Sequence, residues 1–348
     1  MPEPLRNERQ KEILLALVQT YIETAEPVGS GSLARRYNLG LSSATIRNVL
    51  VELENNGYLV KPHTSAGRIP SEKAYRYYVD MIQEARPITD VQVETLREAL
   101  EDHGGGVDEL LKRTSLILSS FSRYMGVVLS PRKLRSVFKR VSFIRIRSGT
   151  VLVVLVSVSG ITQNRLVKHQ EDFSQDALDK MSRYLNDRFS GMSLAEMRQR
   201  VMKDIRMQWE NYDRMMKAAL ELGSYLLDED ESGDVYVGGR SNILDVPEFT
   251  ANLDWMKQLL VTLEEKGNIV ALLDESMKTE GLMIHIGSEV GIDDIKGISL
   301  VTSTYGNGQS SLGTVGIIGP TRMDYSQVIP LVESAAGVVS ESLSKSEI

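Results

Sequence analysis

Hydrophobic residues recur every three or four positions through the first part of the chain, which is the spacing of amphipathic helices. The first pattern predicts a helix over residues 7–24, and the Pro-Val-Gly segment at 27–29 breaks it. Ser30 is placed to cap a short second helix that runs to Tyr37. An Asn-Leu-Gly segment after it supplies the backbone freedom of a turn.

A third helical pattern begins at Ser42 or Ser43, and its apolar stripe is expected to pack on the first two helices. The stripe consists of Ile46, Val49, Leu50 and Leu53. Gly57 ends the helix, and a short strand follows it. Residues 62–67 then form a polar tip from which the chain returns at Ile69. Three helices followed by a hairpin predict a winged helix-turn-helix.

The rest of the chain changes between strand and helix patterns. A helix is predicted over 107–122, strands over 141–146, 150–158 and 161–168, and a helical period from 173 to 222. Strands are predicted again over 268–273, 282–287, 298–305 and 313–318, before a helix over 325–343. Strands on both sides of a helical block favour one α+β domain that is interrupted by an insertion.

Composition and charge narrow the class of protein. A chain of 348 residues is long for one core, so two or three domains are expected. The absence of cysteine, and of any apolar run of about 20 residues, leads us to expect a soluble cytoplasmic protein. The net charge is −7, yet residues 28–78 hold seven Lys or Arg against three Asp or Glu. That asymmetry fits a DNA-binding module on an acidic body.

The exposed face of the third helix carries side chains that can read bases. Arg47 can bond guanine O6 and N7, and Asn48 can pair with adenine N6 and N7. The N–H groups of the first helical turn favour a phosphate. One exposed Arg or Asn is more often solvated surface, but helix, turn, helix and basic hairpin in this order indicate duplex DNA. The predicted DNA contacts are Ser42, Ser43, Thr45, Arg47, Asn48, Lys61, Thr64, Ser65 and Arg68, the last at the base of the wing.

The longest helical pattern covers residues 194–222. Such a stripe is either the core of a local helical bundle or a seam against a second chain, and periodicity alone favours the bundle. The candidate seam residues are Met197, Val201, Ile205, Trp209, Tyr212 and Met216.

Four segments resemble the HrcA family of bacterial heat-inducible transcription repressors. They are residues 42–48 (SSATIRN), 62–70 (PHTSAGRIP), 75–80 (YRYYVD) and 319–325 (GPTRMDY). The resemblance runs from end to end. Ser71 and Ala74 stand where the family usually has Thr and Gly, so the geometry at the exit of the wing is expected to differ slightly.

The resemblance implies a multidomain α+β fold and a regulatory function. The implied domains are a winged helix (1–85), a linker (86–106), a GAF-like domain in two parts (107–172 and 249–348) and a mainly helical inserted dimerisation domain (173–248). It also implies a homodimer that binds an inverted-repeat operator at chaperone operons and is released on heat stress. A GroE-type chaperonin is the implied partner that keeps the repressor active.

Other functions find less support in the sequence. The four histidines are far apart, with no metal-ligand spacing, and no catalytic or cofactor-binding motif is present, so neither an enzyme nor a cofactor is expected. The alternative is a ligand-sensing regulator whose GAF-like domain binds a small molecule. We expect Arg322 to pair with a carboxylate within the protein rather than with a ligand. The basic cluster at 132–147 is a solvated face or a contact for an acidic surface.

Overall fold

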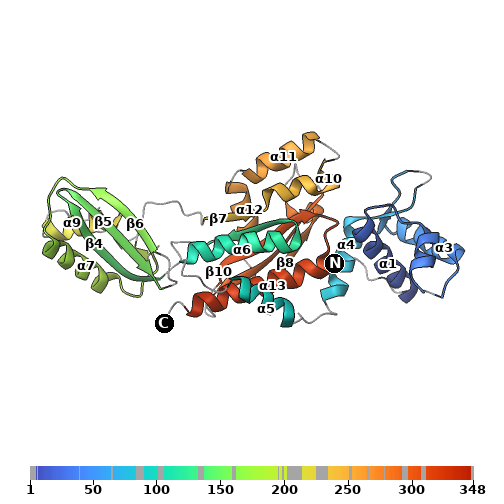
Figure 1. The fold of residues 1–348 in the computed structure, drawn as a ribbon, viewed down its shortest axis with the longest axis horizontal. Coiled ribbons are helices and arrows are strands. Elements are labelled where there is room, and N and C mark those ends of the chain that lie inside the picture. Colours follow the sequence, from blue (N-terminus) through green and yellow to red (C-terminus); the bar gives the residue numbers. More distant parts are fainter. Residues whose placement is uncertain are drawn as a thin grey trace.

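The computed structural model is elongated, and three parts follow one another along its length (Figure 1). It describes residues 5, 7–38, 40–63, 66–83, 90–100, 106–131, 137–158, 162–194, 196–197, 200–201, 214–224, 234–250, 253–264, 266–277, 279–291, 297–306 and 311–345. Over these residues the fold is mixed α+β, with a two-stranded, a three-stranded and a five-stranded sheet. None of the described helices is long and apolar enough to cross a membrane.

The N-terminal unit comprises residues 7–83. Its elements are α1 (Glu8–Thr24), α2 (Ser30–Arg36), α3 (Ser43–Asn55), β1 (Leu59–Val60), β2 (Ile69–Pro70) and α4 (Glu72–Gln83). The helices bury the predicted stripes, and Ile13, Leu17, Leu33, Ile46 and Leu50 are all fully buried. β1 and β2 pair as an antiparallel hairpin. The three helices and the hairpin therefore lie where the hydrophobic pattern predicted them.

The central unit, residues 90–131 and 234–345, is built on an antiparallel sheet of strand order β7-β3-β10-β9-β8. Its strands are β3 (Met125–Leu129), β7 (Val235–Gly238), β8 (Leu282–Ile286), β9 (Ile298–Gly306) and β10 (Ser311–Pro320). Successive side chains of a strand point to opposite faces. Accordingly, Ile317 belongs to one apolar cluster and Ile318 to another.

Helices cover both faces of this sheet (Figure 1). α6 (Val107–Ser122) and α13 (Tyr325–Lys345) pack on one face, with α5 (Asp90–Leu100) against them. α12 (Lys266–Ser276) packs on the other face and contacts α11 (Leu253–Glu264). The remaining elements are the 3₁₀ helices η2 (Arg240–Asp245) and η3 (Gly287–Val290), and α10 (Pro247–Thr250).

The inserted unit, residues 137–224, lies at the far end of the molecule from the N-terminal unit (Figure 1). It contains β4 (Phe138–Arg147), β5 (Thr150–Ser157), β6 (Thr162–Lys168), α7 (Gln175–Phe189) and α9 (Arg214–Ser224). α7 packs on one face of the β4-β5-β6 sheet, where the unit has an apolar core of its own. The unit leaves the central sheet after β3 and returns at β7, and these two strands are paired neighbours.

The structure corrects the predicted boundaries of the insertion. The strands expected over 141–168 were assigned to the GAF-like domain, and the insertion was placed at 173–248. In the structure these strands form a separate sheet whose apolar core includes α7 residues, so they belong to the insertion. The alternation of apolar and polar residues predicts a strand, but it does not say which sheet the strand joins. β3 and β7, which both belong to the central sheet, were not predicted as strands.

Two shorter segments also differ from the prediction. Residues 268–273 lie within α12 and not in a strand. A short apolar run fits either element, and in the helix Ile269, Val270 and Leu273 are buried. The predicted linker at 86–106 contains α5, whose Arg97 pairs with Glu341 of α13 at 2.9 Å.

Candidate nucleic-acid interface

The start of α3 is fixed by hydroxyl groups. Ser42 is the N-cap residue, and its Oγ accepts a hydrogen bond from the Thr45 N–H at 3.1 Å. Such a cap satisfies one of the N–H groups that a helix start leaves unpaired. Ser30 was predicted to cap α2, but Gly29 occupies that position and Ser30 is the first helical residue. The Ser30 Oγ instead lies 3.1 Å from the Ser43 Oγ, which joins the N-termini of α2 and α3.

The two faces of α3 differ in environment. Ile46 and Leu50 are fully buried against the other helices. Arg47 and Asn48 are exposed, and neither has a hydrogen-bond or ion-pair partner among the residues that the structure describes. A guanidinium and an amide therefore project from a rigid, capped helix with all their side-chain donors available.

The hairpin after α3 is held firmly at its base. The N–H and C=O groups of Arg68 pair with those of Val28 at 2.9 Å in both directions. A Cβ added to Gly67 would lie 2.6 Å from the Pro27 carbonyl oxygen, so only glycine permits this approach. Lys61 is exposed on the hairpin, whereas Thr64 and Ser65 lie outside the described residues.

Arg68 has a different environment from the one predicted. Its side chain is only 12% exposed, and its Nε donates to the Glu54 carboxylate of α3 at 2.9 Å. Through its Nε, the guanidinium joins the hairpin to α3. The ion pair was not foreseen because Glu54 lies 14 positions away in sequence.

Other cations of the N-terminal unit are also used within the protein. Arg36 pairs with Glu23, Arg76 pairs with Glu289, and Lys73 donates to the Asn56 carbonyl oxygen at 3.0 Å. The exposed cations without such a partner among the described residues include Arg35, Arg47 and Lys61. The positive surface is thus smaller than the sequence count indicated, and it includes α2, α3 and the hairpin.

The two described side chains of the predicted dimer seam are buried. Met197 and Val201 are fully buried in the core of the inserted unit, so they contribute to packing within one chain. Ile205, Trp209 and Tyr212 lie outside the described residues, as does the side chain of Met216. The core that contains Met197 and Val201 also includes residues of the β4-β5-β6 sheet, so it is not the helical bundle that the period suggested, and the dimer seam stays a prediction for the other residues.

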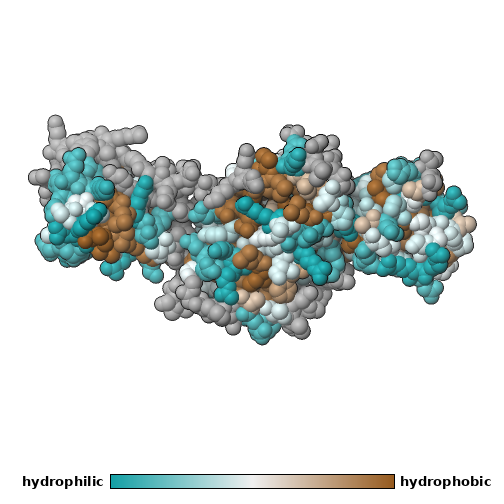
Figure 2. Space-filling view, turned by 45° about the horizontal axis from the view of Figure 1, so that its top comes forward, coloured by the Kyte–Doolittle hydropathy of each residue, from teal (hydrophilic) through white to brown (hydrophobic). Residues whose placement is uncertain are grey.

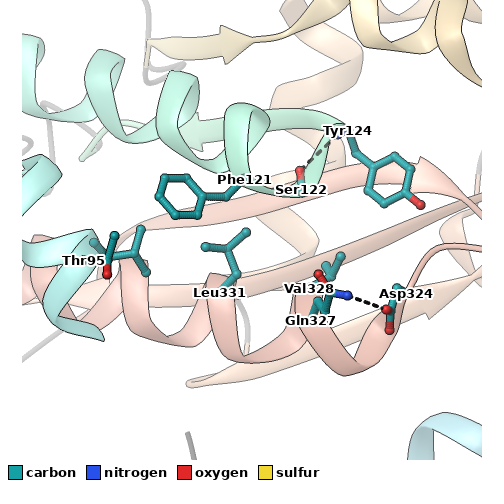
Figure 3. A pocket seen from close by; sticks show the side chains of 9 residues that line it. Thr95, Phe121, Ser122, Tyr124, Asp324, Gln327, Val328 and Leu331 are labelled. Carbon is teal, nitrogen blue, oxygen red and sulfur yellow. Dashed lines mark hydrogen bonds between the residues drawn. The ribbon is translucent and has the colours of Figure 1, made fainter. Parts of the chain in front are cut away.

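A cavity of about 220 Å³ lies between α5, α6 and α13 (Figure 3). Its apolar lining includes Leu96, Phe121, Val328 and Leu331. Two of its polar groups are already paired. The Gln327 amide donates to Asp324 at 2.8 Å, and the Ser122 Oγ accepts from the Tyr124 N–H at 3.1 Å.

The chain is similar in sequence to proteins of one family. The family model described as "HrcA protein C terminal domain" matches residues 108–329. The heat-inducible transcription repressor HrcA of Geobacter sulfurreducens is 42% identical, over 97% of this chain and 98% of the relative. HrcA of Syntrophobacter fumaroxidans is 43% identical, over 97% of both chains. The chain belongs to the HrcA family.

A solved structure supports the fold of this HrcA-family chain. A crystal structure described as that of a hypothetical protein aligns with a TM-score of 0.68 and 23% identity. The alignment covers 97% of this chain and 99% of the other. HrcA proteins are heat-inducible transcription repressors, so family membership makes this chain a negative regulator of transcription and not an enzyme. Repression of transcription in turn implies DNA binding.

Proposed function

We propose that the N-terminal unit is a winged helix-turn-helix whose α3 enters the major groove of operator DNA. The observation that carries the proposal is the exposure of Arg47 and Asn48, whose side chains have no partner among the described residues. They project from a helix whose opposite face is buried. In this arrangement α2 crosses the DNA backbone, and the β1-β2 hairpin is the wing.

The predicted contacts then divide by the chemistry of their side chains. Arg47 and Asn48 read base edges, because their donors and acceptors match guanine and adenine in the major groove. The start of α3 lies next to a phosphate through the hydroxyls of Ser42, Ser43 and Thr45 and the N–H of Ser43, because the Thr45 N–H already donates to Ser42. Lys61, Thr64 and Ser65 supply backbone contacts from the wing. Arg68 stabilises the wing through its ion pair with Glu54 of α3.

The operator in this proposal is an inverted repeat at a chaperone operon, bound by a homodimer. A twofold axis relates two identical protein surfaces and matches the two arms of a palindrome. One N-terminal unit accounts for only one arm. A dimer contact elsewhere in the chain is therefore required.

We place this contact on the face of the β4-β5-β6 sheet opposite α7, which we call the open face, with the inserted unit as the dimerisation unit and the central unit as the GAF-like domain. Ile144, Leu152 and Leu166 lie side by side in one register row. Ile144 is 43% and Leu166 is 63% exposed. Hydrophobic surface gathers on the inserted unit at the left of Figure 2.

The chemistry of this face supports a protein contact. The solvated face of an antiparallel sheet is normally polar, because only the other face packs on a core. Here α7 already covers the face that carries Val151, Val153 and Leu155. The opposite face carries the apolar row Ile144, Leu152 and Leu166 between polar residues, and a second copy of the chain would remove this row from water.

Heat relieves repression, in this proposal, by removing repressor that is folded for operator binding. A GroE-type chaperonin in the cytoplasm is the partner that returns the repressor to the state that binds the operator. Direct unfolding of a marginally stable repressor gives the same output without a chaperonin. Heating the purified chain with and without chaperonin, then measuring operator binding, separates the two routes.

Selection of bound duplexes from a random library tests the DNA-binding proposal. The full chain is expected to enrich an inverted repeat, and the Arg47→Ala/Asn48→Ala variant is expected to lose the sequence preference. Arg9→Ala is the matched control, because Arg9 is an exposed cation near the start of α1. Enrichment of the same repeat by the double variant would refute the assignment of α3.

A further inference from the structure

Two of the segments that characterise the sequence meet at one place in the fold. Residues 75–80 belong to α4 of the N-terminal unit, and residues 319–325 join β10 to α13 of the central unit. The DNA-binding proposal uses neither segment. Both lie at the junction between the two units, and each contributes an arginine that reaches across it.

Arg76 crosses the junction from the N-terminal unit. Its Nη2 donates to the Ile284 carbonyl oxygen at 2.6 Å, and its Nε donates to Glu289 at 3.1 Å. Ile284 lies in β8, which is an edge strand of the five-stranded sheet. The guanidinium therefore occupies the side of the sheet where a further strand would otherwise pair.

The acceptor of this ion pair is itself held in position. Glu289 accepts a hydrogen bond from the Ile286 N–H at 2.9 Å. Burial alone raises the pKa of Glu289, yet the hydrogen bonds from Arg76 and from the Ile286 N–H hold it below its ordinary value. The carboxylate is thus charged at neutral pH and has a fixed orientation toward Arg76.

Arg322 crosses the junction in the opposite direction. Its Nη1 donates to the Ile22 carbonyl oxygen at 2.6 Å, and the same guanidinium pairs with Glu248. Ile22 lies in the last turn of α1, where carbonyl groups lack helical partners. That turn has no basic residue of its own. Arg322 therefore supplies a positive charge to the C-terminal end of the α1 dipole.

A third polar contact and an apolar core complete the junction. The Ser288 hydroxyl donates to Glu72 of α4 at 2.6 Å. Gly287 has φ +57°, which favours glycine, and a Cβ there would lie 2.0 Å from the Glu72 carboxylate, which would have to move. Tyr75 and Tyr325 are buried, with ring centroids 6.3 Å apart. The junction is built like a protein interior, not like a contact between mobile domains.

The position of this junction gives it a consequence for operator binding. The proposed dimer surface is on the inserted unit and α3 is at the opposite end, with the central unit between them (Figure 1). The separation of the two recognition helices in a dimer therefore depends on how each N-terminal unit is seated on its central unit.

We propose that Arg76 and Arg322 are positioning residues for operator recognition, which fix the spacing of half-sites that the dimer accepts. This inference rests on the proposed function. The arginines do not touch DNA in this account, so they leave the sequence of each half-site unchanged. They act by holding α3 at one orientation relative to the dimer axis.

Selection from a random duplex library with the full-length chain and its variants tests the inference. The wild type is expected to enrich one half-site sequence at one spacer length. Arg76→Gln, Glu289→Gln and Arg322→Gln are expected to enrich the same half-site over several spacer lengths. Discrimination between the best and the next spacer should fall by about tenfold. A merely structural role would reduce all binding and leave the spacer length unchanged.

Arg97→Gln is the matched control, because it removes an ion pair that stays within the central unit. Circular dichroism at the assay temperature identifies folded variants, and Glu289→Gln, which changes a single side-chain group, has the smallest effect on packing. Folded variants that keep the single wild-type spacer would overturn the inference. A wild-type chain that enriches no inverted repeat would overturn the proposed function instead.

Discussion

The Nε of Arg68 lies 2.9 Å from the Glu54 Oε2, which joins the base of the hairpin to α3. Arg68 is 12% and Glu54 32% exposed at the side chain, so water screens this pair only in part. The hairpin and α3 consequently form one rigid surface. Any DNA contact made by the hairpin has its register set by α3.

Arg68→Ala is expected to lower the free energy of unfolding by about 1–2 kcal/mol, between the values typical of exposed and buried ion pairs. Urea denaturation measures this loss. The same variant should weaken binding to all DNA sequences to a similar extent, because it loosens the hairpin and removes no base contact. In a double-mutant cycle with Glu54→Ala the two losses should not add, and full additivity would contradict the pairing.

Arg47→Ala and Asn48→Ala should each cost about 1–3 kcal/mol in operator binding and relax the preference at one base position. Both side chains are exposed and unpartnered among the described residues, so the thermal unfolding midpoint should hardly change. Fluorescence anisotropy titrations at a fixed salt concentration measure the loss, with Arg9→Ala as the control. Equal losses for Arg9→Ala and Arg47→Ala would mean that only net charge matters at position 47, and unchanged binding by Asn48→Ala would exclude Asn48 as a base contact.

The N-terminal unit was predictable because its signals are local. The stripe of α3 and its start at Ser42 or Ser43 are each specified within a few positions, and both are found as expected. The boundary of the insertion was not predictable in this way. β3 and β7 are neighbours although about a hundred residues separate them, and only the fold brings them together.

In the candidate site, too, local features were predictable from the sequence and long-range contacts were not. The exposure of Arg47 and Asn48 follows from the helical period of α3 alone. The partners of Arg68, Arg76 and Arg322 were not predictable in detail, because each pairing depends on how two elements pack. A carboxylate partner was predicted for Arg322, and in the structure it is Glu248. The hydrogen bond from Arg322 to the Ile22 carbonyl oxygen joins residues 300 positions apart and was not predicted.

Ser42→Ala should destabilise the N-terminal unit by about 1 kcal/mol, because the Thr45 N–H loses its acceptor. Ser42→Asp keeps an acceptor and should retain stability, yet it places a negative charge where a phosphate is proposed to lie. Thermal unfolding and DNA titration of the two variants therefore separate the cap from the DNA contact. Wild-type affinity in Ser42→Asp would argue against a phosphate at this helix start.

Leu166→Glu on the open face of the inserted sheet should shift the chain from dimer toward monomer, because a dimer would have to bury the new charge. Leu166 is 63% exposed, so the monomer should keep its stability. Sedimentation velocity measures the change. The control is Val261→Glu on α11, where the side chain is 58% exposed. Identical behaviour of the two variants would exclude this face as the dimer contact.

Alkaline pH should destabilise the central unit through Tyr305. Burial raises the pKa of Tyr305 well above its ordinary value, and its hydroxyl donates to the Leu129 carbonyl oxygen at 2.8 Å. The unfolded chain releases this proton near pH 10 while the folded chain retains it. The free energy of unfolding should therefore be unaffected by this group below about pH 9 and fall above about pH 10.

Tyr305→Phe removes the titrating group, so the decline at alkaline pH should be smaller than in the wild type. The variant should also lose about 1 kcal/mol at neutral pH with the hydrogen bond. Urea denaturation at several pH values measures both effects. An unchanged alkaline decline in the variant would assign it to other groups.

The central claim is that α3 reads each arm of an inverted repeat and that two chains bind together. Its most direct test is a titration of the full chain against a duplex that carries the inverted repeat of a chaperone operon. A second duplex has one arm scrambled. We predict much tighter binding to the intact repeat at the same salt concentration, and loss of that preference in Arg47→Ala/Asn48→Ala. Equal affinity for the two duplexes, or an unchanged preference in the double variant, would contradict the account.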